Sequence, residues 1–202
     1  MKFILGRKIG MSQLFDKDGK IVPVTLVSAG PCYVLQKKSK EIDGYSALQI
    51  GFEKLEKKNK IKKTMKGKEY RHLKEIRDKK EIAQEQSLNI GDEINVSVFK
   101  EFEEIKISGM SKGKGFQGGV KRHGFKGRNA THGVKHEQRT IGSTGCRFPQ
   151  HVIKGRRMPG RMGYERVSVK NLKIMKIEPE SNLLVIKGAI PGHKGTLLEI
   201  RG

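Results

Sequence analysis

The chain has 202 residues, a length that suits one or two domains with an apolar core. Its 43 Lys and Arg exceed its 21 Asp and Glu, and the formal net charge is +22. Because self-repulsion of this size opposes compaction, the charge indicates a polyanionic partner rather than a requirement of folding. The sequence holds neither eighteen consecutive apolar residues nor a clear basic amphipathic helix, so we expect nucleic acid as the partner and no membrane.

The N-terminal stretch MKFILGRKIG is a poor signal peptide, because its apolar run is short and Arg7 and Lys8 interrupt it. We therefore expect a cytoplasmic protein. Beyond it, short β-rich or alternating runs bounded by turn residues recur at intervals typical of a small barrel or sandwich. These runs predict strands at 21–27, 32–35, 47–52, 92–99, 104–107, 167–169, 172–177, 183–186 and 196–200.

A lysine-rich stretch at 54–88 has apolar residues spaced too widely to define a helix or strand by period. We interpret it as an insertion in the predicted barrel. Within it we expect a short helix near 66–72 and a strand near 73–79.

The composition changes sharply in the middle of the chain. Residues 108–166 hold 14 Lys and Arg, 2 Asp and Glu, and 13 of the 25 glycines. Such a stretch has too little apolar surface to offset its chain entropy, so we expect it to be mobile alone and to order against a polyanion. We predict a mainly β protein: a body of 1–108 and 167–202, with 109–166 inserted as an extended basic arm.

Three patterns in the basic segment suggest other chemistry, and each lacks the context it needs. Residues 113–118 fit G-x-G-x-x-G, but a second glycine and cations follow where a dinucleotide-binding helix should begin. His132 and His136 have the spacing of metal ligands on a helix, yet a glycine separates them and no Cys or acid cluster completes the set. Cys146 has no acid to orient a histidine base, so nucleophilic catalysis is not expected. We predict no metal, no cofactor and two free thiols.

RNA accounts for the same residues more simply. Lys and Arg neutralise closely spaced phosphates, aromatic rings stack on unpaired bases, and glycine lets the backbone approach closely. DNA fits less well, because no recognition helix or zinc finger is evident. The candidate RNA-binding residues are Arg7, Lys8, Lys112, Lys114, Phe116, Gln117, Lys121, Arg122, His123, Phe125, Lys126, Arg128, His132, Lys135, His136, Arg139, Arg147, His151, Lys154, Arg156, Arg157, Arg161 and Arg166.

Several ordered motifs resemble one family along nearly the whole chain. They are GRKIGMSQLF at 6–15, SKGKGFQG at 111–118, KRHGF at 121–125, KGRRMPG at 154–160 and LLVIKGAIPG at 183–192. Together they resemble the family of bacterial large-subunit ribosomal protein three. Two alternatives stay open: a nucleotide-dependent enzyme that uses 113–118, and an RNA chaperone outside the ribosome.

The resemblance implies a six-stranded barrel of the translation-factor type on the surface of the large subunit. It also implies that the arm runs along ribosomal RNA, with a tip near 143–155 close to the peptidyl transferase centre. Binding near the 3′ end of large-subunit RNA, a role early in assembly and contacts with neighbouring ribosomal proteins follow from it, without enzymatic activity or a small-molecule substrate. Residues 143–151 are one shorter than the usual family form, and Gln150 follows Pro149, so glutamine methylation is not expected here.

Overall fold

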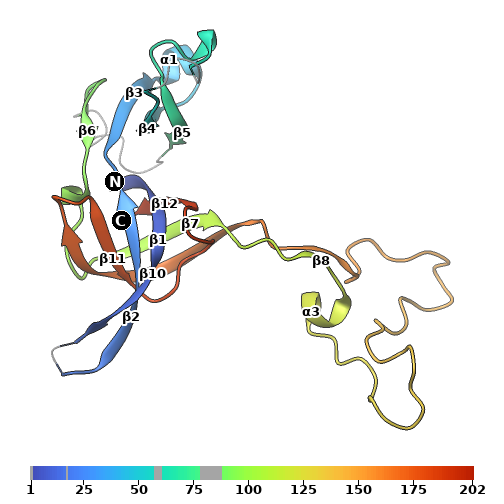
Figure 1. The fold of residues 1–202 in the computed structure, drawn as a ribbon. Helices are drawn as coiled ribbons and strands as arrows, with labels where there is room; N and C mark the ends of the chain where they lie inside the picture. The colour runs from blue at the N-terminus through green and yellow to red at the C-terminus, as the bar shows by residue number, and fades with distance from the viewer. Residues whose placement is uncertain (1, 17, 57–60, 78–87) are drawn as a thin grey trace. The chain divides into compact units, whose positions relative to one another are not determined.

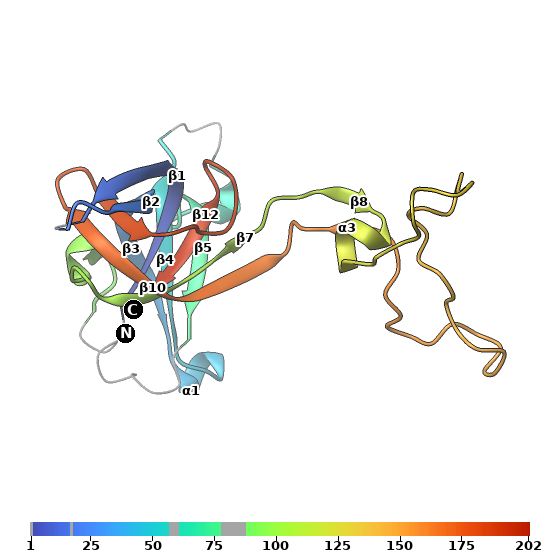
Figure 2. The same ribbon diagram turned by 90° about the horizontal axis from the view of Figure 1, so that it is seen from below.

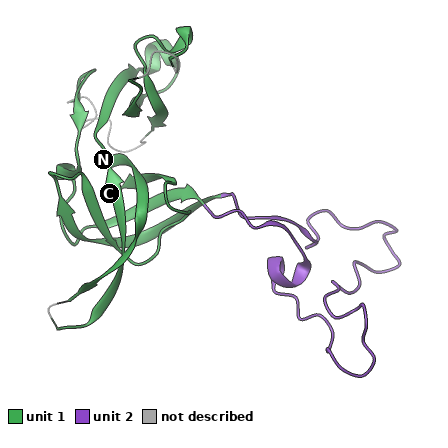
Figure 3. Ribbon diagram, in the orientation of Figure 1, with its two compact units in different colours: residues 1–110, 166–202 green, residues 111–165 purple. Residues whose placement is uncertain are grey.

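The computed structural model describes residues 2–16, 18–56, 61–77 and 88–202 (Figure 1). The chain divides into two compact units, which Figure 3 distinguishes by colour. Unit 1 comprises Met1–Met110 and Arg166–Gly202, and unit 2 comprises Ser111–Glu165. The acid-poor segment of the sequence is therefore a separate unit inserted into the chain of unit 1.

Six antiparallel strands of unit 1 form a closed barrel in the order β1-β12-β7-β10-β11-β2. Figure 2 shows the barrel from below. The expectation of a mainly β fold with a six-stranded barrel is confirmed. The strands are β1 (Phe3–Phe15), β2 (Ile21–Ala29), β7 (Glu104–Met110), β10 (Arg166–Glu178), β11 (Leu183–Lys187) and β12 (Leu197–Arg201). Closure pairs both edges of the sheet, so these strands offer no open edge for pairing with another chain.

Branched aliphatic side chains fill the interior of unit 1. Ile107, Ile174, Leu198 and Ile200 are fully buried, and their strands alternate them with more polar residues. Burying each such side chain stabilises the fold by roughly 1.5–3 kcal/mol. The predicted strands at 167–169 and 172–177 are one continuous strand, β10, with a register shift between Val169 and Leu172.

A second sheet in unit 1 has the order β5-β4-β3-β6. Its strands are β3 (Cys32–Lys38), β4 (Ala47–Lys54), β5 (Tyr70–Ile76) and β6 (Glu93–Ile94), and the short helix α1 (Lys40–Asp43) joins β3 to β4. Val34, Ile50 and Phe52 of this sheet belong to the same apolar cluster as Leu5 and Ile200 of the barrel. A shared core therefore joins the two sheets.

Several sequence-based boundaries are wrong. The first strand, β1, was not predicted, and the predicted strand at 92–99 is only Glu93–Ile94 followed by a 3₁₀ turn at Val96–Val98. The expected helix at 66–72 is absent: a 3₁₀ turn lies earlier, at Lys63–Met65, and β5 already begins at Tyr70. The strand expected at 73–79 is this β5, which ends at Ile76; residues 78 and 79 lie outside the described part of the chain.

Unit 2 contains regular structure near its two ends. Strands β8 (Gly115–Gln117) and β9 (Gly160–Met162) pair antiparallel, and the helix α3 (Gly119–His123) follows β8 directly. This five-residue helix was not predicted from the sequence. Of the helices that the structure describes, none has the length and apolar character needed to span a bilayer.

Candidate nucleic-acid interface

Lys8, a candidate RNA ligand, is a buried residue of the barrel. Its side-chain Nζ donates to the carbonyl oxygens of Ile190 at 2.8 Å and Gly192 at 3.1 Å. The residue is only 8% exposed. Because the ammonium donates to these carbonyls, it stabilises the segment between β11 and β12.

Arg7 is also bound within unit 1. Its Nη2 donates to Glu53 Oε2 at 2.9 Å, its Nε donates to the same carboxylate, and its Nη1 donates to the Gly195 carbonyl oxygen at 2.5 Å. This bonding lowers the pKa of Glu53, although partial burial acts in the opposite direction. His72 Nε2 lies 2.9 Å from Arg7 Nη2, and desolvation together with this cation lowers the pKa of His72. A neutral His72 can therefore accept a hydrogen bond from Arg7.

The third candidate in unit 1, Arg166, is half exposed and pairs with Glu199. Arg166 Nη2 lies 2.5 Å from Glu199 Oε2, while Lys74 Nζ lies 2.9 Å from Glu199 Oε1. Burial raises the pKa of Glu199, but hydrogen bonds from Lys74 and Arg166 outweigh it and the net shift is downward. Glu199 thus links the barrel to the second sheet, and Arg166 has a structural partner.

The other twenty candidate residues all lie in unit 2, whose ends are joined by backbone bonds. The amide of Ser111 donates to the Glu165 carbonyl at 2.9 Å, and the amide of Lys114 donates to the Met162 carbonyl at 2.9 Å. Phe116 lies opposite Arg161 in the β8–β9 ladder. These bonds hold the two ends of the basic segment side by side.

Two side chains of α3 bind one backbone carbonyl of unit 2. Arg122 Nη1 donates to the Met158 carbonyl at 2.7 Å, and His123 Nε2 lies 3.1 Å from the same oxygen. Arg122 was expected to grip phosphate, but this part of its guanidinium fixes the segment before β9. Arg122 therefore helps to position this segment of unit 2.

Phe125 and Ile141 form a small apolar contact next to α3. A Cβ added at Gly119 would lie 2.7 Å from Ile141 Cγ2 and 2.8 Å from Phe125 Cδ2, so only glycine fits there without a shift. The rings of His123 and Phe125 are tilted, with centroids 5.8 Å apart. Residues distant in sequence therefore hold Phe125 in place.

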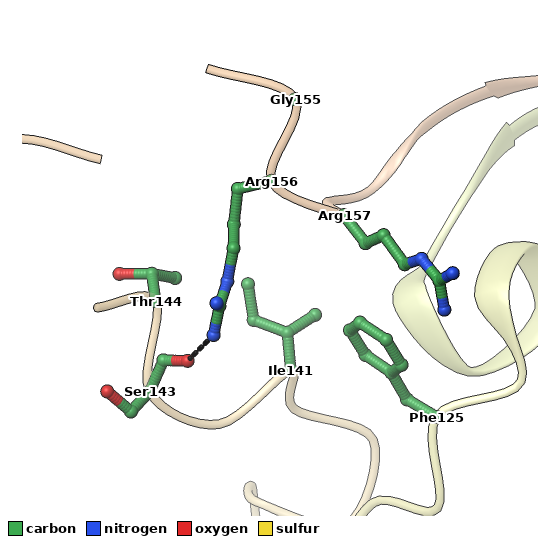
Figure 4. Close-up of a pocket in the computed structure, with 7 residues that line it drawn as sticks. All are labelled: Phe125, Ile141, Ser143, Thr144, Gly155, Arg156 and Arg157. Carbon is green, nitrogen blue, oxygen red and sulfur yellow. Dashed lines mark hydrogen bonds between the residues drawn. The ribbon is translucent and has the colours of Figure 1, made fainter. Parts of the chain in front are cut away.

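A pocket of about 350 Å³ opens next to this contact (Figure 4). Phe125 and Ile141 line one part of it, and Thr144, Arg156 and Arg157 line another. Arg156 Nη2 donates to the backbone carbonyl of Ser143 at 3.0 Å, the bond drawn in Figure 4. Ser143, Thr144 and Ile141 were not predicted as site residues, because no periodic pattern marks them.

Most cations of unit 2 have no partner within it. Residues 111–165 contain 13 Lys and Arg but only Glu137 and Glu165 as acids, and Glu137 pairs with Arg128. Arg161 lies over the Tyr164 ring, 5.1 Å from its centroid. Nine cations make no side-chain hydrogen bond, ion pair or ring contact with the described residues: Lys112, Lys114, Lys121, Lys126, Lys135, Arg139, Arg147, Lys154 and Arg157.

The remaining candidates in unit 2 differ in exposure. Phe116 and Phe148 are each 76% exposed and available for stacking, whereas the Gln117 amide donates to the Lys114 carbonyl. The histidines His132, His136 and His151 are exposed. Over 2–16, 18–56, 61–77 and 88–202, no group of three or more His, Cys, Asp and Glu could hold a metal ion.

Neither cysteine has the surroundings of a nucleophile. Cys32 is buried in the core of unit 1, and desolvation raises its thiol pKa to about 12. Cys146 is exposed, and both thiols are free, as predicted. The G-x-G-x-x-G segment is likewise not a dinucleotide site, because β8 pairs antiparallel with β9 and α3 has only five residues.

A closed β-barrel with a strongly cationic, acid-poor insertion defines a basic β-barrel protein suited to a polyanionic partner. The chain belongs to the ribosomal protein L3 family, whose profile matches residues 52–182. The suspected family is thus confirmed. Members of this family are structural components of the large ribosomal subunit, and the prediction that the chain is not an enzyme is confirmed by its membership.

Relatives from several bacteria match over nearly the whole chain. A large ribosomal subunit protein uL3 from Carboxydothermus hydrogenoformans is 48% identical over 203 residues, covering 99% of this chain and 96% of the relative. The uL3 proteins of Chloroherpeton thalassium and Finegoldia magna are 48% and 42% identical. The two matches span 99% and 100% of this chain, and 98% and 97% of the respective relatives.

Proposed function

We propose that the chain is a structural component of the large ribosomal subunit in the cytoplasm, and that unit 2 is the arm through which it binds large-subunit ribosomal RNA. The nine unpartnered cations carry this proposal. A folded protein gains nothing from so many like charges close together unless a polyanion neutralises them. RNA supplies phosphates at short spacing, and their neutralisation releases counterions.

The finer parts of the proposal follow the family resemblance. The segment 143–155 is the tip directed towards the peptidyl transferase centre, and the barrel acts early in assembly, in contact with neighbouring ribosomal proteins. The exposed rings of Phe116 and Phe148 support contact with unpaired bases, because every base has a face on which an aromatic ring can stack.

A salt titration tests RNA binding. We would measure binding of the full chain to large-subunit RNA by filter retention from low to high salt. If each unpartnered cation neutralises one phosphate, the slope of log K against log salt is roughly −6 to −8, from about −0.7 per phosphate on single strands and −0.9 on duplexes. A slope near zero would contradict the proposal.

Charge-neutral variants locate the contacts. Replacing Lys112, Lys114 and Lys121 with Gln should reduce the magnitude of the slope by about 2–3, roughly 1 per phosphate contact. Replacing three exposed lysines of unit 1 with Gln, Lys40, Lys63 and Lys187, changes the net charge by the same amount and serves as the control. Equal effects of both triple variants would show that net charge, not unit 2, controls binding.

The two alternatives predict different results. A nucleotide-dependent enzyme would bind a labelled dinucleotide saturably and with little dependence on salt, and a chaperone outside the ribosome would sediment in ribosome-free fractions of a sucrose gradient. We expect no saturable dinucleotide binding, and co-sedimentation with the large subunit.

A further inference from the structure

The pocket of unit 2 combines apolar and cationic walls. Phe125 and Ile141 supply an aromatic ring and an aliphatic side chain, and Figure 4 shows Arg156 and Arg157 reaching in from the segment that follows Gly155. No carboxylate is among the described residues that line it. Its volume of about 350 Å³ lies near the lower end of the range for small-ligand sites, which suits a group of nucleotide size and excludes a helix.

The two arginines of the pocket differ in whether they have a hydrogen-bond partner within the chain. Arg156 is tied to the Ser143 carbonyl, so it links two segments of the loop that are 13 residues apart. Arg157 makes no hydrogen bond or ion pair with any residue that the structure describes. An unpartnered guanidinium beside an aromatic wall offers both an anion site and an apolar surface.

We propose that this pocket captures one unstacked nucleotide of RNA. The base packs against Phe125 and Ile141, its phosphate pairs with Arg157, and the Thr144 hydroxyl hydrogen-bonds the base edge or the ribose. Single-stranded nucleotides are recognised in this way, by stacking on aromatic rings and by polar contacts to the exposed edges. The inference rests on the proposed RNA binding of unit 2 and adds a specific contact to it.

Packing prepares the aromatic wall before any ligand enters. Gly119 lets Phe125 and Ile141 lie close to α3, and the His123 ring lies beside Phe125. The Arg156–Ser143 bond fixes the opposite side. A site that is already arranged loses less conformational entropy on binding than an open loop does.

Ultraviolet crosslinking tests the proposal with the full chain bound to large-subunit RNA. After irradiation and digestion, mass spectrometry identifies the crosslinked peptides and nucleotides. We expect Phe125 to crosslink to a single nucleotide position. Crosslinks from Phe125 to many positions, or none while Phe148 crosslinks well, would overturn the inference.

Paired variants separate the pocket from general charge and stacking. Phe125→Leu keeps apolar volume but removes the ring, and we expect affinity for the RNA to fall about five- to tenfold, within the range for loss of one stacked base. Arg157→Gln removes the charge of an exposed side chain; it should lower the salt slope by about 1 and reduce the Phe125 crosslink. The controls Phe148→Leu and Arg147→Gln alter exposed residues outside the pocket; they should weaken RNA binding but leave the Phe125 crosslink unchanged. A Phe125 crosslink that Arg147→Gln reduces as much as Arg157→Gln does would refute a specific site.

A free nucleotide has the same chemistry, so adenosine monophosphate is titrated separately. Tight, saturable binding of this probe that Phe125→Leu abolishes, with RNA binding unchanged, would assign the pocket to a small molecule and overturn the inference. If the unaltered chain fails to bind large-subunit RNA at all, the proposed function is wrong. If it binds with full affinity but Phe125 does not crosslink, only the nucleotide pocket is wrong.

Discussion

Lys8→Met separates a structural lysine from an RNA-binding one. Methionine keeps most of the apolar stem but removes the ammonium that donates to the Ile190 and Gly192 carbonyls. Hydrogen bonds to a charged group contribute about 1.5–3 kcal/mol each, and part of that is offset because a buried charge no longer has to be desolvated. We expect a net loss of about 2–3 kcal/mol in the free energy of unfolding.

Urea unfolding followed by circular dichroism measures this loss, since the chain has no Trp. With a slope of about 1–3 kcal/mol per molar urea, the midpoint should fall by about 1 M or more. We expect the RNA affinity of the folded variant to stay within about twofold, since the Lys8 ammonium is bound to backbone carbonyls. Lys112→Met is the reciprocal control: it should weaken RNA binding and leave the midpoint unchanged. An unchanged midpoint with weakened RNA binding in Lys8→Met would refute this assignment.

Three further predictions concern packing and ionisation. Gly119→Ala should speed proteolytic cleavage around α3, because overpacking there costs about 1–3 kcal/mol, while Gly118→Ala should have little effect because its added Cβ would meet nothing within 4 Å. Ile200→Ala should destabilise unit 1 by about 2–5 kcal/mol in urea, and a loss below 1 kcal/mol would argue against its full burial. The hydrogen bond from Arg7 lowers the pKa of Glu53 in the folded protein, so ionised Glu53 stabilises the fold at any pH above the pKa of a glutamate in the unfolded chain. This stabilisation should be lost as the pH falls below about 4.3. Glu53→Gln should flatten that part of the stability–pH profile, and an unchanged profile would show that the ion pair contributes nothing.

The strands of the body were predictable where one face is apolar and the other polar. β1 was missed because Arg7 and Lys8 interrupt its apolar run, and a buried lysine cannot be told from an exposed one without knowing its carbonyl partners. Phe3, Ile4 and Leu5 are all buried, so the start of this strand shows no alternation either. Tertiary contacts, and not the local sequence pattern, determine both the burial of Lys8 and the continuous burial at the start of β1.

The lysine-rich insertion shows the same limit. A short helix was expected near 66–72, but Tyr70 pairs with Lys54 in the β4–β5 ladder. The Tyr70 ring also covers Gly51, where an added Cβ would lie 2.5 Å from Tyr70 Cγ. Pairing across the sheet overrides a weak local preference.

In the basic segment, charge and glycine content predicted a distinct region but not its internal contacts. Gly119, Phe125 and Ile141 meet across more than twenty residues, and nothing in their spacing indicates a common site. The sequence also could not show that Arg122 binds the Met158 carbonyl while Arg157 has no partner. Both arginines look alike until the chain folds.

The central claim is that the cationic insertion becomes ordered when it binds RNA. Amide hydrogen exchange of unit 2 tests this most directly, by comparing the free chain with the assembled large subunit. We predict that residues 126–140 and 145–154, which lie outside the segments that line the pocket, exchange rapidly in the free chain and become strongly protected in the subunit, while the barrel strands are protected in both. Equal protection of these two segments with and without RNA would contradict it.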